Sequence, residues 1–253
     1  MALTLLAGLL DDATLLSQGS SPSEAVAEHR EHRAAAYAPL VGPLVVPDTQ
    51  LAEVGRHHRD GPDLAVQVVN SGGAGGVLGL SRRTQPGLEV VGVISMLRDL
   101  DDLAGNAARV VAAAEALDPD VTVFVGLPYA PGWPRAVEVV EAAGHCAVIS
   151  PGDPAGPATA AELAEQLAGL IDADLPFKIG SESATYSLTG LLDAVRGLID
   201  GMPATDAAQL LGSDQDLRWA IDSEAEAQRV RRRLRSVNRA QVSAAAADLS
   251  RLG

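Results

Sequence analysis

Lysine is almost missing from this chain, since Lys178 is the single lysine among 19 basic residues and the others are arginine. Lysine is ordinarily among the commonest residues, so the one that remains stands out. Lys178 lies in a short apolar run between Pro176 and Gly180, which predicts a buried strand. A buried amine can lose its proton and attack a carbonyl group, which a guanidinium cannot do. A structural pair with a buried carboxylate is the alternative.

Aromatic residues make up 3% of the chain and hydrophobic residues 47%, so the core must consist of Ala, Val, Leu and Ile. Such a core favours helices packed on a Val- and Ile-rich sheet. The single cysteine, Cys146, excludes an internal disulfide and a cysteine-based zinc site, which favours a cytoplasmic location. Cys146 begins an apolar run and is therefore expected in the core, not as a nucleophile.

Positive charge is scarce as well, and the net charge of −14 repels phosphate backbones and anionic membranes. No apolar run approaches the length needed to span a membrane. The apolar start of the chain lacks basic residues and turns acidic at Asp11, so residues 1–12 predict a folded helix and not a signal peptide. The expected partner is a small-molecule substrate, with no nucleic acid or membrane, and homo-oligomerisation is left open.

From residue 41 the chain alternates Val- and Ile-rich runs with Ala- and Leu-rich helices, which predicts parallel strands joined by crossover helices. The expected strands are Gly42–Val46, Leu64–Val69, Val90–Ser95, Val121–Leu127, Cys146–Ile149 and Pro176–Gly180. The expected helices are Thr49–His58, Leu100–Leu117, Trp133–Ala143, Ala158–Asp172 and Leu188–Asp200.

These units favour one α/β domain over residues 1–253, a complete or incomplete TIM-type barrel of six to eight strands. It comprises a helical segment 1–40, six βα units over 41–200 and a helical segment 201–253, in which a further strand is considered near Leu234–Val237. An open doubly wound sheet is the competitor. It is disfavoured because the first strand lacks the Gly-x-Gly-x-x-Gly turn of dinucleotide-binding sheets.

Active sites of both architectures lie at the carboxyl ends of the strands, which directs attention to polar residues there. As acid/base groups beside Lys178 the sequence offers Glu182, Tyr129 and Asp48. As substrate-binding residues it offers Asn70, Ser71, Gly72, Gly73, Ser95, Ser150, Ser181 and Arg235. For each of them a loop or capping role is the alternative; Asp48, for example, can cap the helix that follows. The glycine-rich segment can cradle an anion or form a flexible turn.

Two further groups are interpreted as surface features. His29 and His32 are expected on a solvated helix face and not at a metal, because no third ligand has suitable spacing. Asp11 and Asp12 are expected as solvated acids, with a site for a hard cation as the alternative. The basic block 229–235 is expected on a solvated helix face, with an acidic patch or an anionic substrate as alternatives. No metal or cofactor is expected.

Several segments resemble a family of uncharacterised bacterial proteins, mostly actinobacterial, for which no reaction can be carried over. The matching segments are Asp11–Ala13, His29–Arg33, Leu40–Pro47, Leu175–Lys178, Arg235–Ser236 and Asp248–Leu249. Relatives continue after the lysine with Ala-Thr-Ala-Gly-Leu-His-His, where this chain has Ile-Gly-Ser-Glu-Ser-Ala-Thr at 179–185. This departure implies that the substrate has changed or that the activity has been lost.

The relatives' lysine strand is also similar to the Lys-Thr-Ser-Thr-Gly strand of deoxyribose-phosphate aldolases, barrel enzymes whose sixth-strand lysine forms a Schiff base. This chain keeps Lys178-Ile-Gly-Ser of that segment and lacks the second lysine that such aldolases use. The resemblance implies a class I aldolase-like lyase with Lys178 as the nucleophile. Two alternatives remain: a cofactor-free isomerase or cyclase in which Lys178 is an electrostatic stabiliser, and a non-catalytic binding or scaffold protein.

Overall fold

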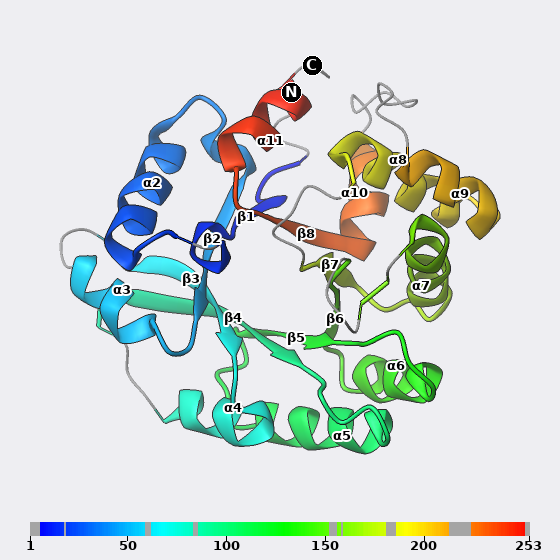
Figure 1. The fold of residues 1–253 in the computed structure, drawn as a ribbon, viewed down its shortest axis with the longest axis horizontal. Coiled ribbons are helices and arrows are strands. Elements are labelled where there is room, and N and C mark those ends of the chain that lie inside the picture. The colour runs from blue at the N-terminus through cyan, green and yellow to red at the C-terminus, as the bar shows by residue number, and fades with distance from the viewer. Residues whose placement is uncertain are drawn as a thin grey trace.

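Eight parallel strands close into a barrel, with helices packed around its outside (Figure 1). The computed structural model describes residues 6–17, 19–58, 62–82, 86–151, 156–157, 159–180, 186–212 and 224–250. Each strand pairs with its neighbours in chain order, and β1 pairs with β8 to close the ring. The expected TIM-type α/β barrel is therefore confirmed, with eight strands, and the open sheet is excluded.

The strands are β1 Leu10–Asp12, β2 Val41–Pro47, β3 Leu64–Asn70, β4 Leu88–Met96, β5 Thr122–Gly126, β6 Cys146–Ile149, β7 Phe177–Ile179 and β8 Leu234–Arg239. The α-helices are α2 Pro22–Ala34, α3 Leu51–His57, α4 Gly73–Ser81, α5 Leu103–Ala114, α6 Trp133–Ala142, α7 Ala160–Asp172, α8 Leu188–Ile199, α9 Ala204–Leu211, α10 Glu224–Arg233 and α11 Val242–Ser250. Short 3₁₀ helices cover Thr14–Leu16 and Ala38–Leu40. None of the helices described here is long and apolar enough to cross a membrane.

Most strands are largely apolar on both faces because they contribute to two cores, and β1 and β8 are the exceptions. On β2, Leu44 and Val46 pack outward with Leu51 and Val54 of α3. Val45, between them, joins a separate cluster inside the barrel. Since successive side chains of a strand point to opposite faces, a barrel strand covered by helices needs apolar residues at nearly every position.

The first strand is the main departure from the expected arrangement. Leu10–Asp12 was expected in a helical segment but forms β1 between β2 and β8. Three residues are too few to show a strand period, and their hydrogen-bond partners lie far away in the chain. The strand considered near Leu234–Val237 is present as β8 in the segment expected to be helical. Because β1 precedes the six expected strands, Lys178 lies on the seventh strand and not the sixth.

Helix α2 is tied to β1 through a buried hydrogen bond. Asp12 Oδ2 lies 2.9 Å from Nδ1 of His29, and Asp12 Oδ1 accepts hydrogen bonds from the backbone N and the hydroxyl of Thr14, at 3.1 and 2.7 Å. His29 and His32 are 3% and 4% exposed, and Asp11 and Asp12 are buried too. The expectation of solvated histidines and acids was wrong, because the pairing partners on other elements were not visible locally.

The Asp12 contact predicts a pH-dependent stability. Burial alone would raise the pKa of Asp12, but the hydrogen bonds with His29 and Thr14 outweigh it and hold the pKa below 3.8. A carboxyl group with a lowered folded-state pKa stabilises the fold above its unfolded pKa, and this contribution is lost as the pH falls through the folded value. Thr14→Ala should lower the free energy of unfolding at pH 6 by about 1–2 kcal/mol.

That difference between Thr14→Ala and the wild type should shrink below about pH 4, as Asp12 becomes protonated. Urea unfolding of both proteins from pH 6 to pH 3 measures it. Thr122→Ala, at an exposed strand position, is the control and should show a pH-independent difference. A pH-independent difference for Thr14→Ala as well would contradict a charged Asp12 at this contact.

Candidate functional site

A polar cluster occupies the interior of the barrel. The Lys178 amine on β7 donates to Asp11 Oδ2 on β1 at 2.6 Å and to Gln67 Oε1 on β3 at 2.5 Å. The Ser236 hydroxyl on β8 donates to the same Asp11 oxygen. None of β1, β3 and β7 neighbours another in the sheet, so these hydrogen bonds cross the interior. The sole lysine is therefore the centre of a network that draws on four strands.

The ring of Phe124 on β5 completes a layer of four side chains, with its centroid 5.2 Å from the lysine nitrogen. Asp11, Gln67, Phe124 and Lys178 come from the four odd-numbered strands, which is the layering typical of TIM barrels. Such layers are ordinarily apolar, because burying charged groups is costly. A layer with an ion pair, an amide and a cation–π contact is therefore a candidate functional site.

Burial sets the electrostatics of this layer. Lys178 is completely buried, and Asp11 is 1% exposed. Desolvation lowers the pKa of Lys178, while the adjacent Asp11 carboxylate partly offsets this effect. The second oxygen of Asp11 has no hydrogen-bond partner among the described residues. It packs against Gly42, where a Cβ atom would overlap it.

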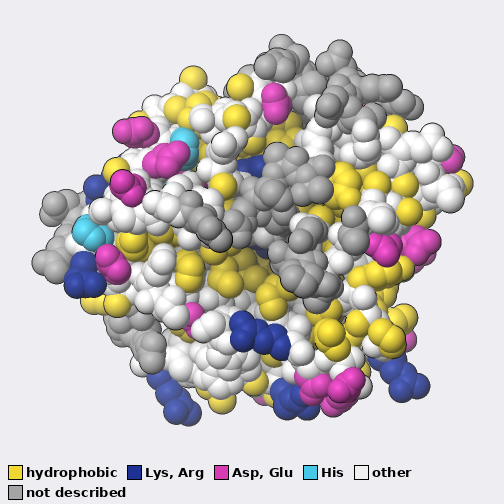
Figure 2. All heavy atoms as spheres, in the orientation of Figure 1, with side chains coloured by type: hydrophobic (Ala, Val, Ile, Leu, Met, Phe, Trp, Pro, Cys, Tyr) yellow, Lys and Arg dark blue, Asp and Glu magenta, His cyan; other side chains and the backbone are white. Residues whose placement is uncertain are grey.

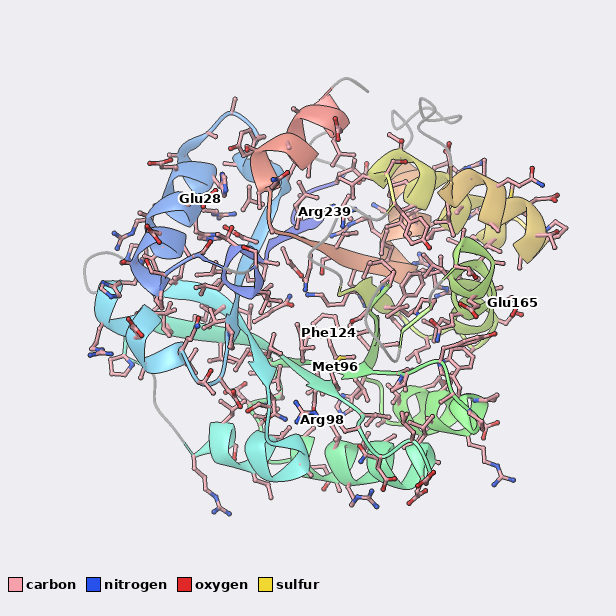
Figure 3. All side chains as sticks on the ribbon, in the orientation of Figure 1. Glu28, Met96, Arg98, Phe124, Glu165 and Arg239 are labelled. Atoms are coloured by element: carbon pink, nitrogen blue, oxygen red, sulfur yellow. The ribbon has the colours of Figure 1, made fainter. Side chains whose placement is uncertain are left out.

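A layer of three apolar side chains and one asparagine lies between this cluster and the carboxyl ends of the strands. The next inward positions on the even-numbered strands are Val45, Ile94, Val148 and Asn238, and each is at most 3% exposed. Met96 packs over Gly126 beyond them, since a Cβ at residue 126 would overlap its sulfur. Figure 3 shows Phe124 and Met96 near the centre of the barrel. Lys178 was expected at the barrel mouth; it lies deeper, in the middle of the core.

Hydrophobic side chains also gather around the centre of the molecular face seen in Figure 2, while acidic side chains lie toward its edge. Among the described residues no three His, Cys, Asp or Glu side chains lie close enough together to hold a metal ion.

Several residues expected at the site meet each other but not Lys178. The amide nitrogen of Asn70 donates to Ser95 Oγ at 3.0 Å and to the carbonyl of Gly73 at 2.8 Å, and its oxygen accepts from Gly72 N. The segment expected as a cradle or a flexible turn instead leads into α4 at Gly73. Asn70 therefore fixes the start of a helix outside the barrel interior.

Asp48 was considered as an acid/base group or as the cap of the following helix. Its Oδ2 accepts from the backbone N and the hydroxyl of Ser71, both at 2.8 Å. Helix α3 has Gln50 at its N-cap position, without a side-chain capping bond. Asp48 thus joins the loops that follow β2 and β3 and caps no helix.

The other expected residues are spread over the molecule. Tyr129 is 41% exposed and donates to Glu165 on α7 at 2.8 Å, which raises the pKa of Tyr129; Figure 3 shows Glu165 at the outside of the barrel. Ser150 follows β6 and lies against Gly180 beyond the apolar layer. Arg235 lies at the amino end of β8, the end opposite the expected mouth. Ser181 and Glu182 lie outside the described residues.

Compared with models of protein families and with curated proteins, the sequence matches none.

The sequence pattern did not identify Asp11, Gln67 and Ser236 as the hydrogen-bonding partners around Lys178. Gln67 was recognisable in the sequence as unusual, because it is the single polar residue in the otherwise apolar run Leu64–Val69. Arg239, at the carboxyl end of β8, is also notable: it is 5% exposed and donates to the carbonyls of Asn238 and Tyr186, at 3.0 and 3.2 Å. Burial lowers its pKa to about 10. No carboxylate of the described residues pairs with it.

Proposed function

We propose that this barrel is an enzyme that acts on a small carbonyl compound through the Lys178 amine, in an aldolase- or lyase-type step. The observation that carries the proposal is the amine of the only lysine, buried inside a barrel at 2.6 Å from a carboxylate. Nucleophilic lysines need a lowered pKa and a nearby acid/base group. Lys178 has both, and Asp11 takes the acid/base role considered for Glu182, Tyr129 and Asp48.

The chemistry follows from the position of the shared proton. Transfer of a proton from the lysine nitrogen to Asp11 Oδ2 gives the neutral amine that the attack requires, and Asp11 then carries the proton. The amine lone pair then attacks the carbonyl carbon, and Asp11 protonates the carbonyl oxygen. Asp11 next takes the extra proton from the nitrogen of the carbinolamine and gives it to the hydroxyl, which leaves as water while the nitrogen lone pair forms the protonated imine. Gln67 holds the amine in place throughout.

Arg239 supports a substrate with an anionic group. A buried guanidinium bonded to backbone carbonyls keeps its charge uncompensated by an acid of the described chain, and carboxylates or phosphates offset such a charge through paired hydrogen bonds. The lysine strand adds a local resemblance to deoxyribose-phosphate aldolases. Its position as the seventh strand differs from theirs. The layer of Val45, Ile94 and Val148 must also part for a substrate to reach the amine.

Borohydride trapping tests the proposal. The protein is incubated with acetaldehyde, pyruvate or dihydroxyacetone phosphate, reduced with borohydride, and analysed by peptide mass mapping. We expect a mass increase on Lys178 with at least one probe and none in Lys178→Arg, since arginine forms no imine under these conditions. Because the chain has one lysine, only the α-amino group competes, and it maps to a different peptide. No adduct with any probe, or an active Lys178→Arg enzyme, would overturn the proposal.

A second candidate is favoured by the apolar layer that covers the amine. The amine is covered by Val45, Ile94 and Val148, which are all at most 3% exposed. Such a closed core suits a non-catalytic binding or scaffold protein, in which the Asp11–Lys178 pair fixes the strand register. Borohydride trapping distinguishes the enzyme from the non-catalytic protein, because an enclosed amine gives no adduct in the folded protein. An activity retained in Lys178→Arg without an adduct would instead support an isomerase or cyclase with an electrostatic lysine.

A further inference from the structure

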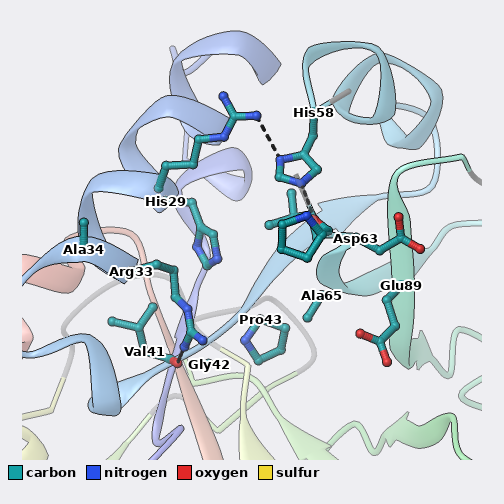
Figure 4. A pocket seen from close by; sticks show the side chains of 13 residues that line it. His29, Arg33, Ala34, Val41, Gly42, Pro43, His58, Asp63, Ala65 and Glu89 are labelled. Carbon is teal, nitrogen blue, oxygen red and sulfur yellow. Dashed lines mark hydrogen bonds between the residues drawn. The ribbon is translucent and has the colours of Figure 1, made fainter. Parts of the chain in front are cut away.

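A second candidate site lies outside the barrel interior. A cavity of about 680 Å³ opens between α2, the carboxyl end of α3 and the amino ends of β2, β3 and β4 (Figure 4). Its lining includes His29 and Arg33 from α2, Pro43 from β2, Asp63 and Ala65 around the start of β3, and Glu89 from β4. This volume is in the range of small-molecule sites.

Opposite charges line opposite sides of this cavity. Figure 4 shows His29 and Arg33 on one side, and Asp63 and Glu89 on the other, with Pro43 and Ala65 between them. Arg33 donates to the carbonyl of Val41 at 2.8 Å and makes no ion pair with a described residue. Asp63 and Glu89 are exposed and form no ion pair within the described chain either. Arg30 also lines the cavity and makes no ion pair with a described residue, so two arginines face two carboxylates, and none of the four is in an ion pair within the described chain.

The remaining basic groups of the lining are held in place. Nδ1 of His29 is engaged by Asp12 at 2.9 Å, so Nε2 is the free nitrogen of a ring whose orientation is fixed. Arg30 lies 3.1 Å from Nδ1 of His58, whose Nε2 bonds to the carbonyl of Pro62. The cationic side is therefore built on α2, where the buried Asp12 fixes the ring of His29, and this favours a defined ligand geometry.

We propose that this cavity binds a small zwitterionic molecule in which an apolar body separates an anionic from a cationic group. A carboxylate accepts hydrogen bonds from Arg33, with His29 beside it. An ammonium group lies between Asp63 and Glu89, and the body of the ligand packs on Pro43 and Ala65. A purely anionic ligand would meet the two carboxylates, and a purely cationic ligand would meet Arg33. This binding is independent of any reaction at Lys178.

Calorimetric titration with matched probes tests the proposal. The series 4-aminobutyrate, 6-aminohexanoate and 8-aminooctanoate varies the distance between the two charges. Hexanoate and hexylammonium carry one charge each. We expect at least one zwitterion to bind about tenfold more tightly than both single-charge probes. Arg33→Met should weaken the zwitterion and hexanoate about tenfold, and Glu89→Gln should weaken the zwitterion and hexylammonium.

Both variants change exposed side chains, and Arg33→Lys keeps the charge and should retain most of the binding. Arg109→Met is the matched control, since Arg109 is an exposed arginine on α5 paired with Asp99; it should bind like the wild type. Hexanoate binding as tightly as the best zwitterion would overturn the proposal. No saturable binding, or equal affinities in Arg33→Met and Arg109→Met, would do so as well. Each outcome leaves the trapping result at Lys178 unaffected.

Discussion

Replacing Lys178 with methionine is expected to lower the free energy of unfolding by about 3–5 kcal/mol. Methionine fills most of the lysine's volume, so cavity formation contributes little. The cost arises because the Asp11 carboxylate, 1% exposed, then lies in the barrel without its cation. The amide oxygen of Gln67 loses a donor too. Urea unfolding at pH 7 measures the change.

A double variant separates the lost charge from the lost packing. Asp11→Asn combined with Lys178→Met removes both charges, and we expect it to recover most of the stability, as neutral replacements of buried ion pairs do. Ser236 can still donate to the amide oxygen of the new side chain. The interaction free energy of the two changes should exceed about 1.5 kcal/mol. A single-variant cost below about 1 kcal/mol would contradict a charged pair at the centre of the barrel.

The second large effect is expected at Gly42. Alanine there should destabilise the protein by about 1–3 kcal/mol, the range typical of overpacked cores. Its Cβ would overlap Asp11 Oδ1, and Asp11 is held from its other oxygen by Lys178 and Ser236. The carboxylate therefore cannot move without breaking the cluster. Thermal and urea unfolding of Gly42→Ala measure the cost.

Two controls test this reason for the Gly42 effect. In an Asp11→Ala background most of the cost of Gly42→Ala should disappear, because the overlapping atom is gone and only the carbonyl oxygen of Leu10, at 3.3 Å from the added Cβ, remains close. Gly79→Ala in α4 meets no atom within 4 Å and should stabilise the helix by about 0.5–1 kcal/mol. A cost of Gly42→Ala that persists in the Asp11→Ala background would show that the backbone, and not Asp11, requires glycine.

The local pattern of apolar residues predicted the elements in which buried positions recur at a regular spacing. The strand Cys146–Ile149 and the helix beginning at Leu188 were placed at the ends the structure gives them. The pattern failed at β1, whose three residues carry two acids. The pattern also did not predict the helix Gly73–Ser81, because four of its nine residues are glycine. In each case contacts with neighbouring elements outweigh a weak or contrary local preference.

The sequence by itself determined the class of fold and the burial of the key amine. Alternating apolar strands and Ala-rich helices require a parallel sheet covered by helices, and a lysine within an apolar strand must be buried. Only the tertiary structure decided which groups meet that amine. Asp11 and Gln67 lie 167 and 111 positions from Lys178 in the chain. Closure of the ring and the tilt of its strands bring them together, and local periodicity encodes neither.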